Sequence, residues 1–113
     1  MKEFLFIYRS DYLSIPQGSP EQMEALTLRW MDWIKSIGIQ NKLTDRGNRL
    51  TTTGKVVKSN DVVINGPFME IKEFIGGYTL IKSTSYDDAI ELAKGCPILS
   101  IGGNVEVREI DPV

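Results

Sequence analysis

Two helix start signals divide this chain, and each follows a segment that alternates like a β-strand. The first joins Ser19, which can cap a helix, to Pro20 at the first helical position and Gln22 at the capping-box position. The second joins a capping Ser85 to Asp88 at the same spacing, and acidic residues favour the positive end of a helix. Together these signals predict two helices, each preceded by a strand.

Each predicted helix has an apolar stripe and a stop. We expect the first to end at Gly38 and the second at Gly95 and Pro97. The first stripe consists of Met23, Leu26, Trp30, Ile34 and Ile37, widened by Met31 and Trp33. The second consists of Tyr86, Ala89, Ile90, Ala93 and Cys96. We expect the two tryptophans to pack in the core or at a dimer contact, and Cys96 to be packed rather than reactive.

Strand-like segments fill much of the remaining chain. Residues 3–9, 77–83 and 105–110 are each expected to form a strand. Residues 39–65 are rich in turns and short apolar runs, which we interpret as a meandering hairpin. The order strand, helix, hairpin, strand, helix, strand is that of the ferredoxin-like βαββαβ sandwich. We therefore predict an α+β fold in a single domain, residues 1–113, with both helices on one face of an antiparallel sheet.

The first strand is apolar on both faces. Phe4, Phe6 and Tyr8 lie on one face and Leu5 and Ile7 on the other. A sheet with one wet face would alternate apolar with polar residues. Because the helices can cover only one face, we predict a homodimer whose sheets pack face to face over more than about 1,000 Å².

Composition removes several classes of function. The chain has 113 residues, a net charge of −2 and no histidine. The acidic balance argues against a nucleic-acid-binding surface. Without histidine no Ser-His-Asp or Cys-His pairing can exist, and acid–base chemistry falls to Asp, Glu, Lys, Tyr or Cys96. We expect no metal and no cofactor.

The same composition bears on location. No segment approaches the roughly 20 apolar residues of a membrane-spanning helix, and the apolar run near the N-terminus is too short for a signal peptide. The single cysteine leaves no internal disulfide. We therefore expect a cytoplasmic protein with no membrane partner.

A signature-like stretch runs from Asn65 to Tyr78. Its residues Asn65-Gly66-Pro67-Phe68, Glu70, Lys72-Glu73 and Gly76-Gly77-Tyr78 resemble the DGPF…E-K-E…GG-[FY] signature of the YCII-related, DGPF-type family. Cys96-Pro97, Gly102-Gly103 and Glu106-Val107-Arg108 are similar to later parts of that family. The resemblance implies a small bacterial-type protein with the dimeric α/β-barrel architecture. Its relatives include proteins suspected of small-molecule chemistry, and some are encoded beside or fused to transcription sigma factors.

Two departures from the family weigh against catalysis. The leading Asp of the signature is Asn65 here, and an Asn can line a cleft and orient a ligand but cannot act as a general base. Asn65-Gly66 is equally a good turn pair. The wider group often carries a His-Asp pair thought to be an active site, and this chain has no histidine.

The charged residues of the signature have two interpretations. Glu70, Lys72 and Glu73 form either a solvated segment or the source of one carboxylate that points into a cleft. The neighbouring Gly76-Gly77 lacks the spacing of a phosphate loop. We expect this pair to form a bulge or a close backbone approach where a strand begins.

The last strand supplies the remaining site candidates. If Val105 and Val107 face the helices, Glu106 and Arg108 face the dimer interior. There they form a structural ion pair or meet a polar ligand. Arg108 and Arg9 together could hold an anionic substrate.

Three functions follow from these observations. The first is a dimeric module with a small polar ligand cleft. The second is a cofactor-independent enzyme that acts on a small anionic or aromatic molecule through Glu or Asp acid–base chemistry. The third, suggested only by the resemblance, is a regulatory partner of the sigma-factor transcription machinery.

Overall fold

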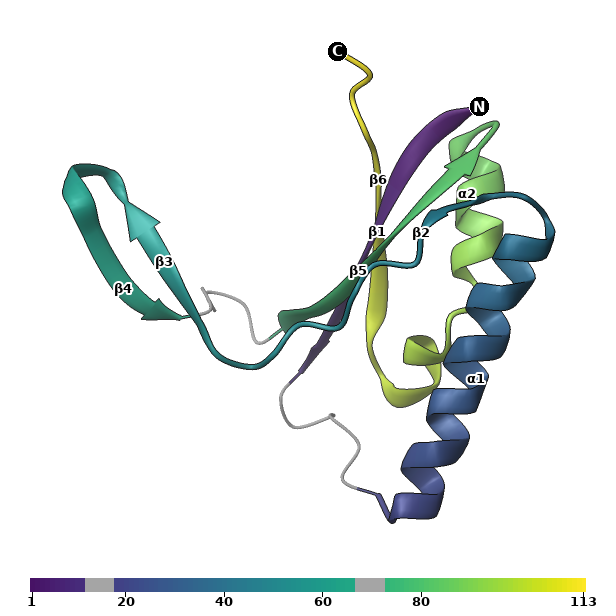
Figure 1. Cartoon of the computed structure of the whole chain (residues 1–113), viewed down its shortest axis with the longest axis horizontal. Coiled ribbons are helices and arrows are strands. Elements are labelled where there is room, and N and C mark those ends of the chain that lie inside the picture. The colour runs from purple at the N-terminus through teal and green to yellow at the C-terminus, as the bar shows by residue number, and fades with distance from the viewer. Residues whose placement is uncertain (12–17, 67–72) are drawn as a thin grey trace.

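A computed structural model describes residues 1–11, 18–66 and 73–113 and shows the ferredoxin-like α+β arrangement (Figure 1). Four antiparallel strands form the main sheet in the order β2-β5-β1-β6, and β3 and β4 form a separate two-stranded sheet. The elements are β1 Lys2–Asp11, α1 Pro20–Ile39, β2 Leu43–Asp45, β3 Gly54–Lys58, β4 Val62–Gly66, β5 Glu73–Ser83, α2 Tyr86–Ala93 and β6 Asn104–Glu109, with short 3₁₀ helices at Ser59–Asp61 and Pro97–Ile101. The predicted fold class is confirmed.

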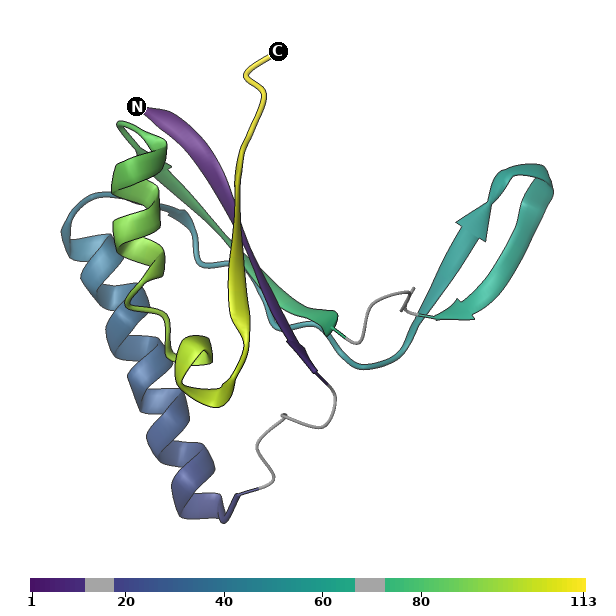
Figure 2. The same ribbon diagram turned by 180° about the vertical axis from the view of Figure 1, so that it is seen from behind.

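Both helices cover the same face of the main sheet (Figures 1 and 2). Phe4, Phe6 and Tyr8 of β1 point into this layer and are buried, as the alternation predicts. Leu5 and Ile7 lie on the opposite face, which we call the outer face, and are half-buried. No helix among the described residues lies over the outer face.

Helix α1 begins as its sequence signal predicts. The Ser19 hydroxyl accepts from the Gln22 N–H, and the Gln22 side chain accepts from the Ser19 N–H, which completes a capping box. The expected stop at Gly38 is wrong, because the helix continues to Ile39 and the left-handed residue that follows is Asn41, with φ of 60°. Asn tolerates this conformation better than other non-glycine residues.

The stripes of both helices are narrower than the periodicity suggests. Met31 is exposed on α1, and Tyr86 and Ile90 are exposed on α2. Buried positions on α2 are Ala89 and Ala93, with Cys96 beyond its end. A short helix needs only a row of small residues to lie close to the sheet, so its larger apolar side chains stand at the edge of the contact.

The start of α2 differs in one detail from a full capping box. The Ser85 hydroxyl accepts from the Asp88 N–H as expected. The Asp88 carboxylate, however, binds Ser83 and Lys42 instead of the Ser85 backbone. The Ser85 N–H donates to the Ser83 hydroxyl in its place.

The region between α1 and β5 contains the predicted hairpin, but only part of it joins the main sheet. β2 pairs with β5, whereas β3 and β4 pair with each other and project from the body on the side of the outer face (Figures 1 and 2). We call residues 54–66 the arm. In the part of the chain that the structure describes, no helix is long and apolar enough to cross a membrane.

Candidate ligand-binding site

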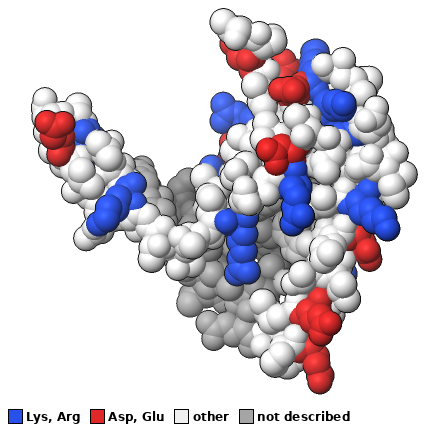
Figure 3. Space-filling view, viewed as in Figure 1, with Lys and Arg blue, Asp and Glu red and all other residues white. Residues whose placement is uncertain are grey.

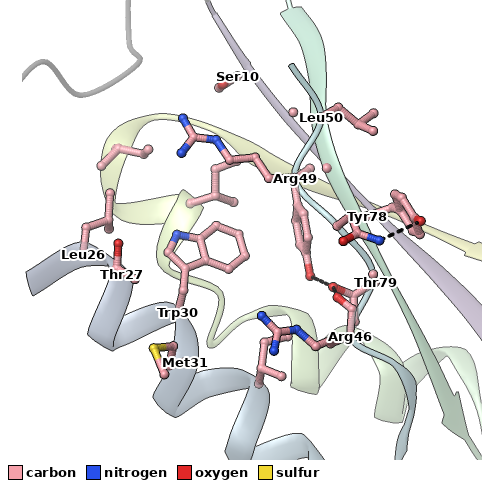
Figure 4. A pocket seen from close by; sticks show the side chains of 18 of the residues that line it. Ser10, Leu26, Thr27, Trp30, Met31, Arg46, Arg49, Leu50, Tyr78 and Thr79 are labelled. Carbon is pink, nitrogen blue, oxygen red and sulfur yellow. Dashed lines mark hydrogen bonds between the residues drawn. The ribbon is translucent and has the colours of Figure 1, made fainter. Parts of the chain in front are cut away.

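A cavity of about 590 Å³ lies between α1 and residues 46–52, which we call the wall segment (Figure 4). The C-terminal part of β1, the N-terminal half of β5 that pairs with it and the 3₁₀ helix at Pro97–Ile101 complete its lining. Apolar lining residues include Met23, Leu26, Trp30, Ile34, Leu50 and Ile98. A volume of this size suits a small organic molecule.

The helix side of the cavity is an aromatic layer that the core holds in place. Trp33 is buried, stacks on Phe6 at 6.1 Å between ring centroids, and donates from Nε1 to the Leu92 carbonyl at 3.0 Å. Trp30 lies against Trp33 and meets Tyr8 edge to face at 4.8 Å. Because Trp33 is fixed on several sides, Trp30 presents a defined indole surface to the cavity.

Three glycines bring the wall segment close to β5. Gly47 has φ of +69°, and its N–H donates to the Asp45 carboxylate at 2.8 Å. The Leu50 N–H donates to the Gly76 carbonyl at 2.8 Å, and an added Cβ on Gly77 would lie 2.9 Å from the Asn48 carbonyl oxygen.

The pairing of β1 with β5 also shifts register between Tyr8 and Arg9, opposite Gly76. The expected bulge and the expected close backbone approach at Gly76-Gly77 are therefore both confirmed.

A chain of hydroxyl groups ties the wall segment to the sheet. The Tyr8 hydroxyl donates to Thr79 Oγ1 at 2.6 Å, and Thr79 Oγ1 donates to the Arg46 carbonyl at 2.9 Å. Burial raises the pKa of Tyr8 well above its usual value, so the phenol is neutral at physiological pH. These hydroxyl groups fix the backbone at Arg46 and are not free to exchange protons with a ligand.

Cations, and no carboxylates, border the described part of the cavity. Lys35, Arg46 and Arg49 are among the described lining residues, and none of the described lining residues is an Asp or a Glu. Among the described residues, none of these three side chains has an ion-pair partner. Figure 4 shows the two arginines reaching from the wall segment toward α1, on either side of Trp30.

The profile of the YCII-related domain family matches residues 17–113 of this sequence. The chain belongs to the YCII-related domain family. A comparison with curated proteins gave no match.

Among solved structures, the chain is similar to 5-chloro-2-hydroxyhydroquinone dehydrochlorinase (TftG) from Burkholderia phenoliruptrix AC1100, in its complex with 2,5-dihydroxybenzoquinone. The TM-score is 0.52 at 15% sequence identity, over 96% of this chain and 93% of that one. At this identity the likeness supports the fold of the YCII-related domain.

In this YCII-related domain, three of the predicted site residues meet on the outer face and not in the cavity. Arg9 Nε donates to Glu106 Oε1 at 3.1 Å, and Arg108 Nη1 donates to Glu106 Oε2 at 3.2 Å. Val105 and Val107 pack against the core, as the strand alternation predicts. The hydrogen bond from Arg108, and then that from Arg9, lower the pKa of Glu106, which therefore stays ionised.

Among the described signature residues of the YCII-related domain, Asn65 lies apart from this group. Asn65 is on β4 in the arm, where its Oδ1 accepts from Lys55 Nζ at 2.9 Å, and it borders a second, more open hollow at the root of the arm. Glu70 and Lys72 lie outside the described residues. The backbone of Glu73 pairs with that of Asp11, and the structure does not describe the Glu73 side chain.

Sequence reasoning missed Trp30, Arg46 and Arg49 as site residues. Trp30 belongs to a helical stripe, and such stripes usually pack in a core. Arg46 and Arg49 flank a turn at Gly47, and two cations beside a glycine that needs a left-handed conformation could have indicated an exposed, rigid loop. Only the pairing of the wall segment with β5 places them opposite α1.

Proposed function

We propose that this YCII-related protein is a dimeric small-molecule-binding protein whose ligand lies in the cavity between α1 and the wall segment. The observation that carries this proposal is the cavity of about 590 Å³ with its supported indole surface. Rigid aromatic side chains beside a few polar groups are typical of small-molecule sites. The structural neighbour, solved with a small ring compound, supports such a ligand by fold-level analogy alone.

The described lining favours binding over catalysis by a carboxylate, a thiolate or the Tyr8 phenol. It contains no Asp, Glu or Cys, and the phenol of Tyr8 is held neutral by burial. Burial also raises the pKa of Cys96 to about 12, away from the thiolate form that a nucleophile needs. An enzyme using a carboxylate base would take it from Glu70 or Glu73, whose side chains the structure does not describe.

A blocked cavity tests the proposal. Thr27 and Leu28 are neighbours on α1 and both are exposed, but only Thr27 lines the cavity. We expect small aromatic compounds that raise the melting temperature of the wild type to lose this effect in Thr27→Trp and to keep it in Leu28→Trp. Thermal-shift screening followed by titration of Trp fluorescence measures both. The absence of any ligand, or equal binding to both variants, would contradict the proposal.

The same ligand separates binding from turnover. If the wild type converts a bound compound, and Glu70→Gln or Glu73→Gln abolishes conversion while leaving affinity unchanged, the protein is the carboxylate-dependent enzyme of the alternative hypothesis. If the compound is recovered unchanged from the wild type, the binding function stands. The regulatory partnership with transcription proteins stays a prediction of the family resemblance.

The outer face supports the dimer in this proposal. Leu5, Ile7 and Leu80 share that face, because Leu5 pairs with Leu80 in the register of β1 and β5. Arg9, Glu106 and Arg108 lie on the same face, where the two arginines form ion pairs with Glu106. Because these charges are already paired within one chain, a second copy can cover this apolar surface without burying an unpaired charge. The buried, unpaired thiol of Cys96 suits the reducing cytoplasm that we propose as its location.

A further inference from the structure

We infer that the ligand of the cavity is a flat aromatic oxyanion, with its ring against Trp30 and its negative group held by one of the two arginines of the wall segment, Arg46 or Arg49. This inference rests on the proposed function, because it assigns the chemical class of the ligand in the same cavity. It makes the two arginines the residues that determine specificity.

The charges around the cavity carry the first step. The whole chain has a net charge of −2, yet the described lining holds three cations and no carboxylate. Figure 3 shows acidic side chains at the N-terminal end of α1 and others beside the blue side chains of this face, so the charge separation is confined to the cavity lining. Cations without partners beside a partly enclosed apolar space favour an anion over a neutral molecule of the same shape.

The kind of cation carries the second step. Two of the three side chains are arginines, whose planar guanidinium matches a carboxylate, sulfonate or phenolate through paired N–H donors. Both come from the wall segment, whose backbone is fixed by the Thr79 hydroxyl at one end and by pairing of Arg49 with Gly77. The arginines therefore start from a fixed backbone, and less freedom is lost when they hold an anion.

The position of Trp30 carries the third step. Its indole comes from α1, on the opposite side of the cavity from the backbone of the two arginines (Figure 4). The rings of Tyr8 and Trp33 lie nearly perpendicular to it, and it remains half-buried, so part of its surface faces the cavity. A ligand that contacts both the Trp30 indole and an arginine of the wall segment must have an apolar ring at one end and a negative group at the other.

Two fluorescent probes of one scaffold test this directly. 1-Anilinonaphthalene-8-sulfonate and N-phenyl-1-naphthylamine differ by one sulfonate group. We expect the wild type to bind the sulfonate at least about tenfold more tightly, a preference that Arg46→Gln/Arg49→Gln reduces to less than about threefold without weakening the neutral probe. Raising the salt concentration should weaken the binding of the sulfonate probe and leave that of the neutral probe unchanged. Arg29→Gln, a charge removal on α1 outside the lining, should keep the full preference.

The outcomes separate the inference from the proposed function. If Thr27→Trp blocks both probes but the wild type binds them equally, the cavity is a ligand site and the anion assignment is wrong. The assignment is also wrong if the preference survives removal of both arginines. If Thr27→Trp leaves the binding of both probes unchanged, they bind elsewhere and the proposed function itself fails.

Discussion

Asp88 joins three parts of the chain through one carboxylate. Lys42 Nζ, just after α1, lies 3.0 and 2.9 Å from its two oxygens, and the Ser83 hydroxyl at the end of β5 donates to Oδ2 at 2.5 Å. Hydrogen bonds from Ser83 and then from Lys42 lower the pKa of Asp88. A residue that the sequence marks as half of a capping box thus fastens α2 to the sheet and to the end of α1.

Replacement of Asp88 by Asn should make the loss of stability depend on pH. Because the folded-state pKa is lowered, the carboxylate stabilises the fold above its unfolded-state pKa of about 4 and loses this effect as the pH falls through the lowered value. We expect Asp88→Asn to lower the free energy of unfolding by about 1–2 kcal/mol at neutral pH and by much less below pH of about 3. Urea unfolding across this pH range measures the difference.

Asp87→Asn is the matched control for this pH dependence. Asp87 is exposed in the same first turn of α2, so it shares the helix-end charge without the partners of Asp88. We expect Asp87→Asn to lower the free energy of unfolding by only about a few tenths of a kcal/mol. A loss for Asp88→Asn that is equal at all pH values would show that shape, and not ionisation, matters at this position.

Among the elements, the wall segment depends most on single glycines. An added Cβ at Gly47 would lie 1.8 Å from the Tyr78 carbonyl oxygen, and the residue has positive φ. Gly102 also has positive φ, at +83°, but an added Cβ there meets nothing within 4 Å. The two positions therefore separate the cost of an unfavourable backbone conformation from that of a clash.

We expect Gly47→Ala to lower the free energy of unfolding by about 3 kcal/mol or more, and Gly102→Ala by about 1 kcal/mol. The clash should also move the wall segment away from β5 and weaken ligand binding in Gly47→Ala, while Gly102→Ala binds normally. Thermal unfolding and probe titration measure the two effects. Equal losses in the two variants would show that the wall segment adapts and does not fix the cavity.

Local signals predict elements well and their long-range neighbours poorly. The caps at Ser19 and Ser85 give both helix starts, because capping depends on residues within one turn. Gly76-Gly77 predicts a close backbone approach without saying which segment approaches. That segment comes from residues 48–50, and no periodicity connects it to β5. The cavity results from this pairing, which explains why the sequence indicated charged residues on the outer face instead.

At the scale of the whole molecule, the arm and the outer face point to the same partner. The arm is a two-stranded hairpin, a form that is marginally stable alone in water. Val57 and Val63 pair on one of its faces and Val56 and Ile64 on the other, and Val57 is 73% exposed. Apolar pairs on both faces suit a hairpin that is covered, and the arm projects on the side of the outer face.

We therefore expect a stable dimer at micromolar concentration in sedimentation experiments, and Ile7→Lys, at the centre of the outer face, to shift it to monomer. Val57→Asp in the arm should weaken association by at least about tenfold, because a charge replaces an apolar contact with the second copy. Leu28→Lys, an equally apolar exposed site on α1, should leave the dimer intact. A monomeric wild type would refute the dimer. A dimer broken by Ile7→Lys but unchanged by Val57→Asp would confine the interface to the sheet and leave the arm outside it.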